Sequence, residues 1–191
     1  MNCAYPSPAG HTHRRIATMA VGALLIAIAT ACGGSDPAPD PAPPTADLSA
    51  VRSFEITAQT HVTTPVQYDQ SPPVGGDHYP AWQNCGSYAE VVPNEMAVHS
   101  MEHGAVWIAH DPGLAADDIR LLRAHADGQT HVLVTPYAGL GERIVLSAWG
   151  KQLTVDTADD PRIAAFVAAY QQGPQTPEPG APCSGAVGEP L

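Results

Sequence analysis

Apolar residues recur with two different periods between residues 51 and 170, and these periods predict alternating strands and helices. Residues 105–110 (AVWIAH) carry consecutive apolar side chains without alternation, which is typical of a strand buried on both faces. Residues around 53–60 alternate between apolar and polar side chains and predict a further strand. The remaining strand candidates are residues 131–136, 143–150 and 152–156.

Three segments show the apolar spacing of a helix. The clearest is 160–173, where Asp160 can cap the first turn and apolar residues recur at i, i+3, i+4 and i+7. A second helix is expected over 114–128. A short third helix is expected over 93–104, with Asn94 as its N-cap.

This order of elements predicts an α+β fold, a single small domain in which helices pack on a mixed sheet. The order loosely resembles that of thioredoxin, although the chain has no Cys-x-x-Cys motif for that chemistry. Residues 63–94 show little periodicity and many prolines and glycines. A compact domain seldom keeps so long an irregular loop unless the loop binds something.

The N-terminal residues 1–31 have the pattern of a secretory signal. Arg14 and Arg15 precede an uncharged apolar run that is short for a membrane span and ends in small residues before Cys32. We therefore expect a lipoprotein signal, cleaved so that Cys32 becomes a lipidated N-terminus. An ordinary signal cleaved nearby and an uncleaved anchor are the alternatives.

Composition sets the remaining boundaries. Residues 32–50 are rich in Pro, Ala, Asp and Gly and predict a disordered tether, followed by a single α+β domain over 51–191 with a Pro/Gly-rich C-terminal tail. Removal of residues 1–31 would take two basic residues and no acidic ones from a chain of net charge −11, leaving −13. Such a charge disfavours nucleic acid as a partner, so we expect contact with the membrane through the lipid anchor alone. No protein partner is predicted.

Two of the four cysteines have no assigned role once the signal and the lipid site are set aside. Cys85 and Cys183 would lie in an oxidising compartment, where an isolated pair of thiols usually forms a disulfide. A metal site that uses both cysteines is the rival interpretation.

Residues 99–103 (HSMEH) place two histidines and a glutamate within one short helix. His99 and His103 are four residues apart, so their imidazoles project from one helix face, which Glu102 borders. The pattern His-x-x-Glu-His also occurs in zinc peptidases, where two histidines bind zinc and the glutamate activates water. A peptidase also needs a later carboxylate ligand, and the acidic residues available, Asp117 and Asp118, have no distinguishing feature.

A binding site for a transition metal needs fewer assumptions than a peptidase, so no catalysis is assumed. His61 follows the first strand and His78 lies in the irregular loop, and together with the helical pair they would offer four imidazoles, which suit copper or zinc. Glu102 would be a ligand or support one. The alternative is a set of hydrogen-bonded structural histidines. The other histidines of the domain, which are His110, His125 and His131, are expected to belong to that class or to the surface.

A metal-free binding module is a further alternative. Tyr79, Trp82 and Tyr88 in the irregular loop could hold a sugar or a peptide. Met101, two positions from each helical histidine, points away from their face and is expected in the core rather than on a metal.

Several separate motifs, in order, resemble the bacterial domain of unknown function 3105 family. They include THVTTPVQY, PPVGGDH, WQNCGSY, VHSMEHG, HVLVTPY, SAWG and the tail GPQTPEPGAPC, so the resemblance runs from about Gln59 to Cys183. Gly75 stands where the family has serine or threonine, and Met101 replaces its usual leucine.

The resemblance implies a secreted or membrane-attached protein, and it marks the polar and cysteine positions already singled out. The residues that match the family's polar motif positions are His61, His78, His99, Glu102 and His103, and those that match its cysteines are Cys85 and Cys183. It implies no particular metal, substrate or reaction.

The lipoprotein signal leads to a first prediction. Cells that express the protein and are fed a palmitate analogue should label it, and Cys32→Ser should abolish the label, because the thiol is the acceptor. Release of an unlabelled wild-type protein into the medium would contradict the prediction.

Overall fold

A computed structural model describes residues 46–140 and 144–191. The predicted signal, the lipidation site at Cys32 and most of the predicted tether lie outside the described residues. Among the helices of the described part, none is long and apolar enough to cross a membrane.

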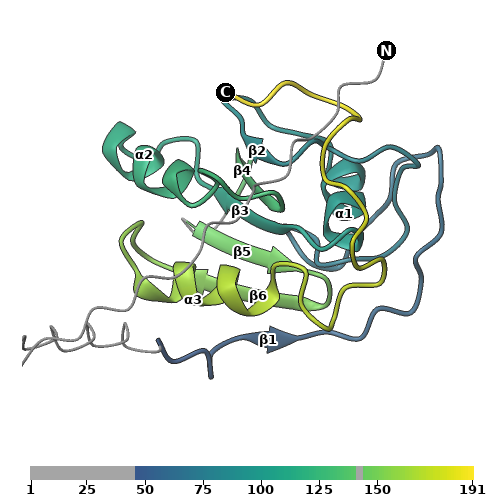
Figure 1. Ribbon diagram of the computed structural model, residues 1–191, viewed down its shortest axis with the longest axis horizontal. Helices are drawn as coiled ribbons and strands as arrows, with labels where there is room; N and C mark the ends of the chain where they lie inside the picture. Colours follow the sequence, from purple (N-terminus) through teal and green to yellow (C-terminus); the bar gives the residue numbers. More distant parts are fainter. Residues whose placement is uncertain (1–45, 141–143) are drawn as a thin grey trace, which may run out of the picture. The chain divides into compact units, whose positions relative to one another are not determined.

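The described residues form six strands and three helices, which confirms the α+β class with a mixed sheet (Figure 1). In chain order they are β1 (Arg52–Ser53), β2 (Gly86–Ser87), α1 (Asn94–Glu102), β3 (Val106–His110), α2 (Ala116–Ala124), β4 (Val132–Pro136), β5 (Ile144–Ala148), β6 (Lys151–Val155) and α3 (Pro161–Tyr170).

The sheet has the strand order β1-β6-β5-β3-β4-β2. Its centre is the pair β3 and β4, which run parallel with α2 as their crossover, while β5 lies antiparallel to β3 and β6 antiparallel to β5. The short β2 adds a parallel edge to β4, and β1 adds an antiparallel edge to β6. The likeness to the thioredoxin order stays a prediction.

The central strands are buried on both faces, as the unbroken apolar run of β3 predicts. Val106 and Ile108 pack with α2 and α3 in one hydrophobic cluster, whereas Trp107 and Ala109 pack with α1 in another. Because successive residues of a strand point to opposite faces, one strand contributes to both clusters. The sheet therefore separates α2 and α3 from α1, and α1 carries the HSMEH residues.

The predicted strand over 53–60 is wrong beyond its first residue, because β1 contains only Arg52 and Ser53. After Ser53 the chain reaches the turn between β5 and β6, where the Phe54 amide donates to the Gly150 carbonyl at 2.9 Å. Among the described residues, no strand pairs with the chain beyond that turn, so the ladder ends. The irregular loop predicted over 63–94 contains one short strand, β2, which the sequence pattern did not predict.

The two predicted helix caps have different outcomes. Asp160 accepts a hydrogen bond from the Arg162 amide at 2.9 Å and caps α3 as expected. Asn94 does not cap α1, since it is the first helical residue after Pro93 and its side-chain amide donates to the Tyr137 hydroxyl. With the Asn94 side chain turned to that hydroxyl, α1 begins without a side-chain cap.

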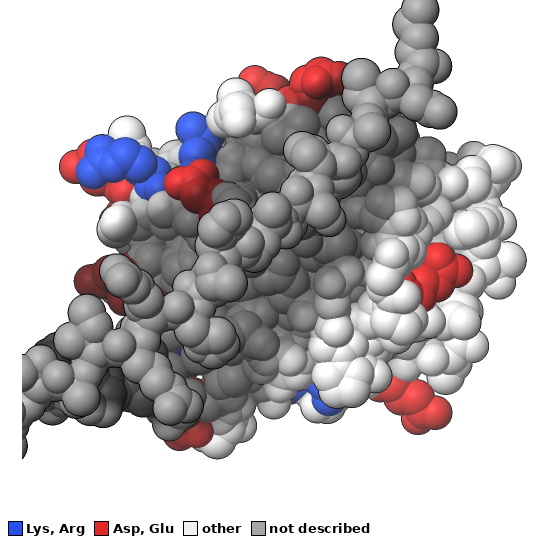
Figure 2. All heavy atoms as spheres, in the orientation of Figure 1, with Lys and Arg blue, Asp and Glu red and all other residues white. Residues whose placement is uncertain are grey.

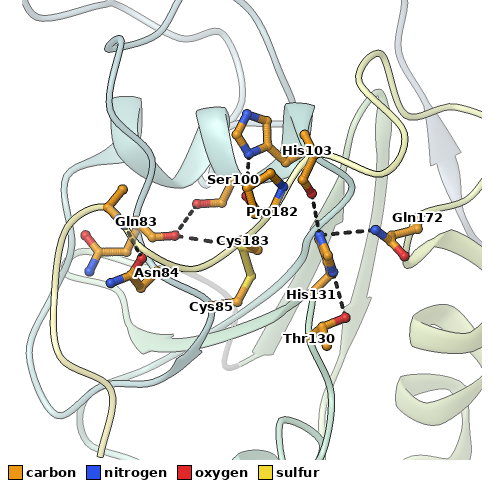
Figure 3. Close-up of a disulfide and its surroundings, with 12 residues drawn as sticks. Gln83, Asn84, Cys85, Ser100, His103, Thr130, His131, Gln172, Pro182 and Cys183 are labelled. Carbon is orange, nitrogen blue, oxygen red and sulfur yellow. Dashed lines mark hydrogen bonds between the residues drawn. A yellow bond between two sulfur atoms is a disulfide. The ribbon is translucent and has the colours of Figure 1, made fainter.

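The C-terminal tail packs against the end of α1 and is fixed there by the predicted disulfide between Cys85 and Cys183 (Figure 3). Gly104, which follows α1, has φ +100°, and a Cβ atom added to it would lie 3.0 Å from the Gln172 Cα. The Gly104 carbonyl accepts a hydrogen bond from the Gln172 amide at 2.8 Å. A glycine at this position thus lets the tail approach the helix closely.

The disulfide should contribute measurably to stability because it closes a loop with a sequence separation of 98 residues. We expect the double variant Cys85→Ser, Cys183→Ser to lose about 2–4 kcal/mol of the free energy of unfolding in urea. Reductant should lower the stability of the wild type and leave that of the double variant unchanged. Equal denaturation midpoints for the two oxidised proteins would contradict the prediction.

Candidate metal centre

His61 and His78 are brought together by backbone pairing between two loop segments. The Val62 amide donates to the His78 carbonyl at 2.8 Å, and the His78 amide donates to the Thr60 carbonyl at 3.1 Å. This bridge places the two imidazole centroids 4.9 Å apart. The side chain of His78 is fully buried, whereas that of His61 is 51% exposed.

The last turns of α1 and its C-cap residue, His103, supply the other side chains of the cluster. His99 and His103 lie one turn apart, and their Nε2 atoms are separated by 3.0 Å. The Oε2 atom of Glu102 lies 2.9 Å from the His78 Nε2 atom and 3.8 Å from the His61 Nε2 atom. All three helical residues are buried. Helix spacing and the loop bridge together therefore assemble four histidines and one glutamate.

Backbone carbonyls fix the orientation of the three buried imidazoles. The Nδ1 atoms of His78, His99 and His103 lie 2.9, 2.6 and 2.7 Å from the carbonyl oxygens of Gly76, Tyr79 and Pro182, respectively. A carbonyl oxygen only accepts hydrogen bonds, so each Nδ1 carries the hydrogen. In a neutral ring the Nε2 atom then carries the lone pair, and all three Nε2 atoms face the cluster.

The contacts inside the cluster pair acceptors with acceptors. With neutral rings, the lone pairs of His99 and His103 face each other, and the His78 Nε2 atom faces the Glu102 carboxylate. This Nε2 atom and Oε2 of Glu102 are buried, and neither makes a hydrogen bond of suitable direction. Buried acceptors of this kind are costly unless a proton or a cation lies between them.

These side chains form two groups that could hold a metal ion, and the two groups share Glu102. One group is His61, His78, His99 and Glu102, and the other is Glu102, His103 and Glu178, with the ligand atoms of each group within 4.8 Å of one another. Glu178 was not predicted from the sequence. The predicted disulfide could have indicated Glu178. It holds Cys183 beside Cys85 in the middle of the chain, and Glu178 lies only five positions before Cys183.

The other sequence candidates lie outside both groups. His110 and His131 are buried, and the Nε2 atom of His131 interacts with the Ala181 carbonyl at 2.9 Å. The side chain of Asp117 is 81% exposed and pairs with Arg120. Asp117 therefore does not supply the carboxylate ligand that a peptidase of the His-x-x-Glu-His type would take from α2.

The aromatic residues of the loop are divided between the core and the cluster. Tyr88 is buried, and its hydroxyl donates to the Asn84 carbonyl at 2.7 Å. The ring of Trp82 lies 4.8 Å from that of His103 and 5.6 Å from that of His99. Met101 is fully buried in the core, as predicted.

On the face drawn in Figure 2, most of the Lys and Arg atoms gather over α2, next to acidic atoms. The paired residues there are Arg120 and Asp117, whose side-chain atoms lie 2.7 Å apart. Basic and acidic side chains are therefore intermixed over α2.

The chain belongs to a protein family whose members are described as proteins of unknown function (DUF3105), because the family profile matches residues 61–185. The match begins at His61 and includes every residue of both ligand groups. Comparison with the curated proteins and with the solved structures found no similar protein. The family assignment confirms the resemblance seen in the sequence and specifies no activity.

The pKa of His99 is lowered to about 4. Burial is the main cause, the hydrogen bond to the Tyr79 carbonyl opposes it, and the nearby imidazoles of His103, His78 and His61 add to the lowering. His99 is therefore neutral at physiological pH. A neutral imidazole is the form that binds a metal ion.

The lowered pKa of His99 predicts a pH-dependent stability of the metal-free protein. The unfolded chain binds a proton at this histidine below about pH 6.5, whereas the folded protein binds it only near pH 4. The free energy of unfolding should therefore fall as the pH is lowered from about 6.5 to 4. Urea titrations of chelator-treated wild type and His99→Gln check this, and an equally steep fall in the variant would contradict it.

Proposed function

We propose that this protein is an extracytoplasmic lipoprotein that binds a transition-metal ion through its histidine cluster. The ligands are His61, His78, His99 and Glu102, with His103 completing the cluster. Binding requires no catalytic step. Cys32 anchors the protein to the outer face of the bacterial cell membrane, and the Pro/Ala tether of residues 32–50 separates the binding domain from the lipid.

The convergence of lone pairs in a buried site is the observation that carries this proposal. Hydrogen bonds to carbonyls orient the imidazoles of His78 and His99 so that both Nε2 atoms face Glu102 and His61. Metal-binding histidines typically donate their second ring nitrogen to a carbonyl or carboxylate in this way. If the histidines were purely structural, a proton would have to lie between the facing acceptor atoms. The lowered pKa of His99 opposes its protonation.

Copper and zinc are the ions that suit the donor set best. Three imidazoles and one carboxylate are ligands of intermediate softness, which Zn²⁺ and Cu²⁺ both accept. The exposed His61 gives an ion a route from solvent to the buried donors. Glu102 contributes a negative charge that offsets part of the charge of a divalent ion.

The hydrolase alternative would use Glu102 as a base rather than as a ligand. The position of its Oε2 atom, within the ligand group and 2.9 Å from the His78 Nε2 atom, favours the ligand role. Activity assays on the metal-loaded protein separate the two roles. Glu102→Gln would retain the metal and lose hydrolysis only if the glutamate activates water.

Removal of one ligand should weaken metal binding without unfolding the protein. Full-length protein purified without a histidine tag and stripped with chelator should bind Zn²⁺ or Cu²⁺ in calorimetric titrations. We expect His61→Ala to weaken the affinity by at least about 10–100-fold, because a donor is lost from a largely exposed side chain. Glu102→Gln should weaken it further, since the variant also removes the negative charge.

His125→Ala is the matched control, because this half-buried histidine lies outside both ligand groups. The control should keep the wild-type affinity, and melting curves of the metal-free proteins should show that His61→Ala remains folded. Equally weak binding by the wild type and the Glu102→Gln variant would overturn the proposed function. A lower melting temperature of Glu102→Gln without any effect on metal would instead support structural histidines.

A further inference from the structure

We propose that a second divalent ion binds beside the first, held by Glu102, His103 and Glu178, with the Glu102 carboxylate bridging the two ions. This inference rests on the proposed function and extends it to a two-ion centre. The ligand atoms of these three residues lie within 4.8 Å of one another. Glu102 and His103 are buried, whereas the side chain of Glu178 is 55% exposed.

His103 is directed toward this second position. Its Nδ1 atom donates to the Pro182 carbonyl at 2.7 Å, so the lone pair of the neutral ring is on Nε2. This Nε2 atom lies 3.5 Å from Oε2 of Glu178 and 3.0 Å from the His99 Nε2 atom. His103 belongs to the group with Glu178 and not to the group of the first ion.

One ion in the first group leaves the lone pair of His103 without a partner. The His99 ring has a single lone pair, on Nε2, and the first ion uses it. The facing lone pair of His103, 3.0 Å away, then needs a cation of its own. Glu178, which pairs with His103, adds the carboxylate that makes this a three-donor site.

Glu102 is placed to bridge because it belongs to both groups. A carboxylate has two oxygens and can give one to each ion, and ions in two-metal sites lie roughly 3.5–4 Å apart. Two carboxylates and neutral imidazoles give the centre a charge of −2, which offsets half of the charge of two divalent ions. Water or a small anion could supply the remaining ligands through the exposed side near Glu178.

The folded tail holds Glu178 in place. The Glu178 amide donates to the Glu102 carbonyl at 3.1 Å, so the backbones of these two ligands are joined directly. Pro182, the carbonyl partner of His103, precedes Cys183 of the disulfide (Figure 3). The tail thus supplies one ligand and orients another. An ordinary surface ion pair between Glu178 and His103 would require neither the backbone bond to Glu102 nor the bond from His103 to the Pro182 carbonyl.

The donor sets of the two positions differ in kind. The first position offers three imidazoles and a carboxylate, while the second offers one imidazole and two carboxylates. Nitrogen-rich sites favour Cu²⁺ and Zn²⁺, and oxygen-rich sites favour harder ions such as Mn²⁺, with Zn²⁺ accepted by both. Zn²⁺ alone is therefore the probe for the number of ions bound.

Metal analysis of the full-length protein tests the inference. Chelator-stripped protein is equilibrated with Zn²⁺, passed through a desalting column and analysed for zinc per chain. We expect two equivalents for the wild type and one for Glu178→Gln, which removes a charge from an exposed side chain and leaves the backbone bond to Glu102 intact. His103→Gln should also bind one equivalent. Glu90→Gln, an exposed acidic residue outside both groups, is the control and should bind two.

The possible counts separate the two proposals. One equivalent in the wild type overturns the second ion and leaves the proposed function standing, whereas none overturns both. Two equivalents that persist in Glu178→Gln and His103→Gln place the second ion elsewhere and also overturn the inference. His61→Ala tests the opposite case. It should weaken binding of the first ion, while all three donors of the second ion, Glu102, His103 and Glu178, remain in place.

Discussion

Hydrogen bonds from three imidazole Nδ1 atoms to backbone carbonyls control the chemistry of the histidine cluster. Each bond fixes which ring nitrogen carries the hydrogen, so the Nε2 lone pairs of His78, His99 and His103 all face inward. Without these bonds the rings could change tautomer or rotate, and the cluster could satisfy itself internally. With them, a buried group of acceptors is held together, and a cation is the partner that neutral rings lack.

The carbonyls that accept these bonds come from segments with little regular structure. Gly76 and Tyr79 belong to the long loop, and Pro182 belongs to the C-terminal tail. The loop packs with α1 in one hydrophobic cluster, on the side of the sheet opposite to α2 and α3, and the tail contacts the end of α1 through the bond from the Glu178 amide to the Glu102 carbonyl. This explains why a small domain keeps so much irregular chain, because the loop and the tail form the outer support of the cluster while the sheet and α1 form its base.

The disulfide joins these two supports. It connects Cys85, which precedes β2 within the loop, with Cys183, which follows the Pro182 carbonyl that orients His103. Across the same junction, the Cys85 amide donates to the Cys183 carbonyl at 2.7 Å. A covalent bond therefore limits how far the tail can move from α1. The position of Glu178 beside Glu102 depends on this junction, so the architecture of the tail and the composition of the second ligand group are linked.

Local sequence patterns determined the α+β class, the buried central strand and the pairing of His99 with His103, because strand period and helix spacing act over a few residues. Local patterns failed for the strand over 53–60 and for the cap at Asn94, since these depend on which neighbour remains available for hydrogen bonds. Only the tertiary structure placed Glu178 beside Glu102 and turned each Nε2 atom inward. Those contacts join positions far apart in the chain, so folding alone, and not residue spacing, brings them together.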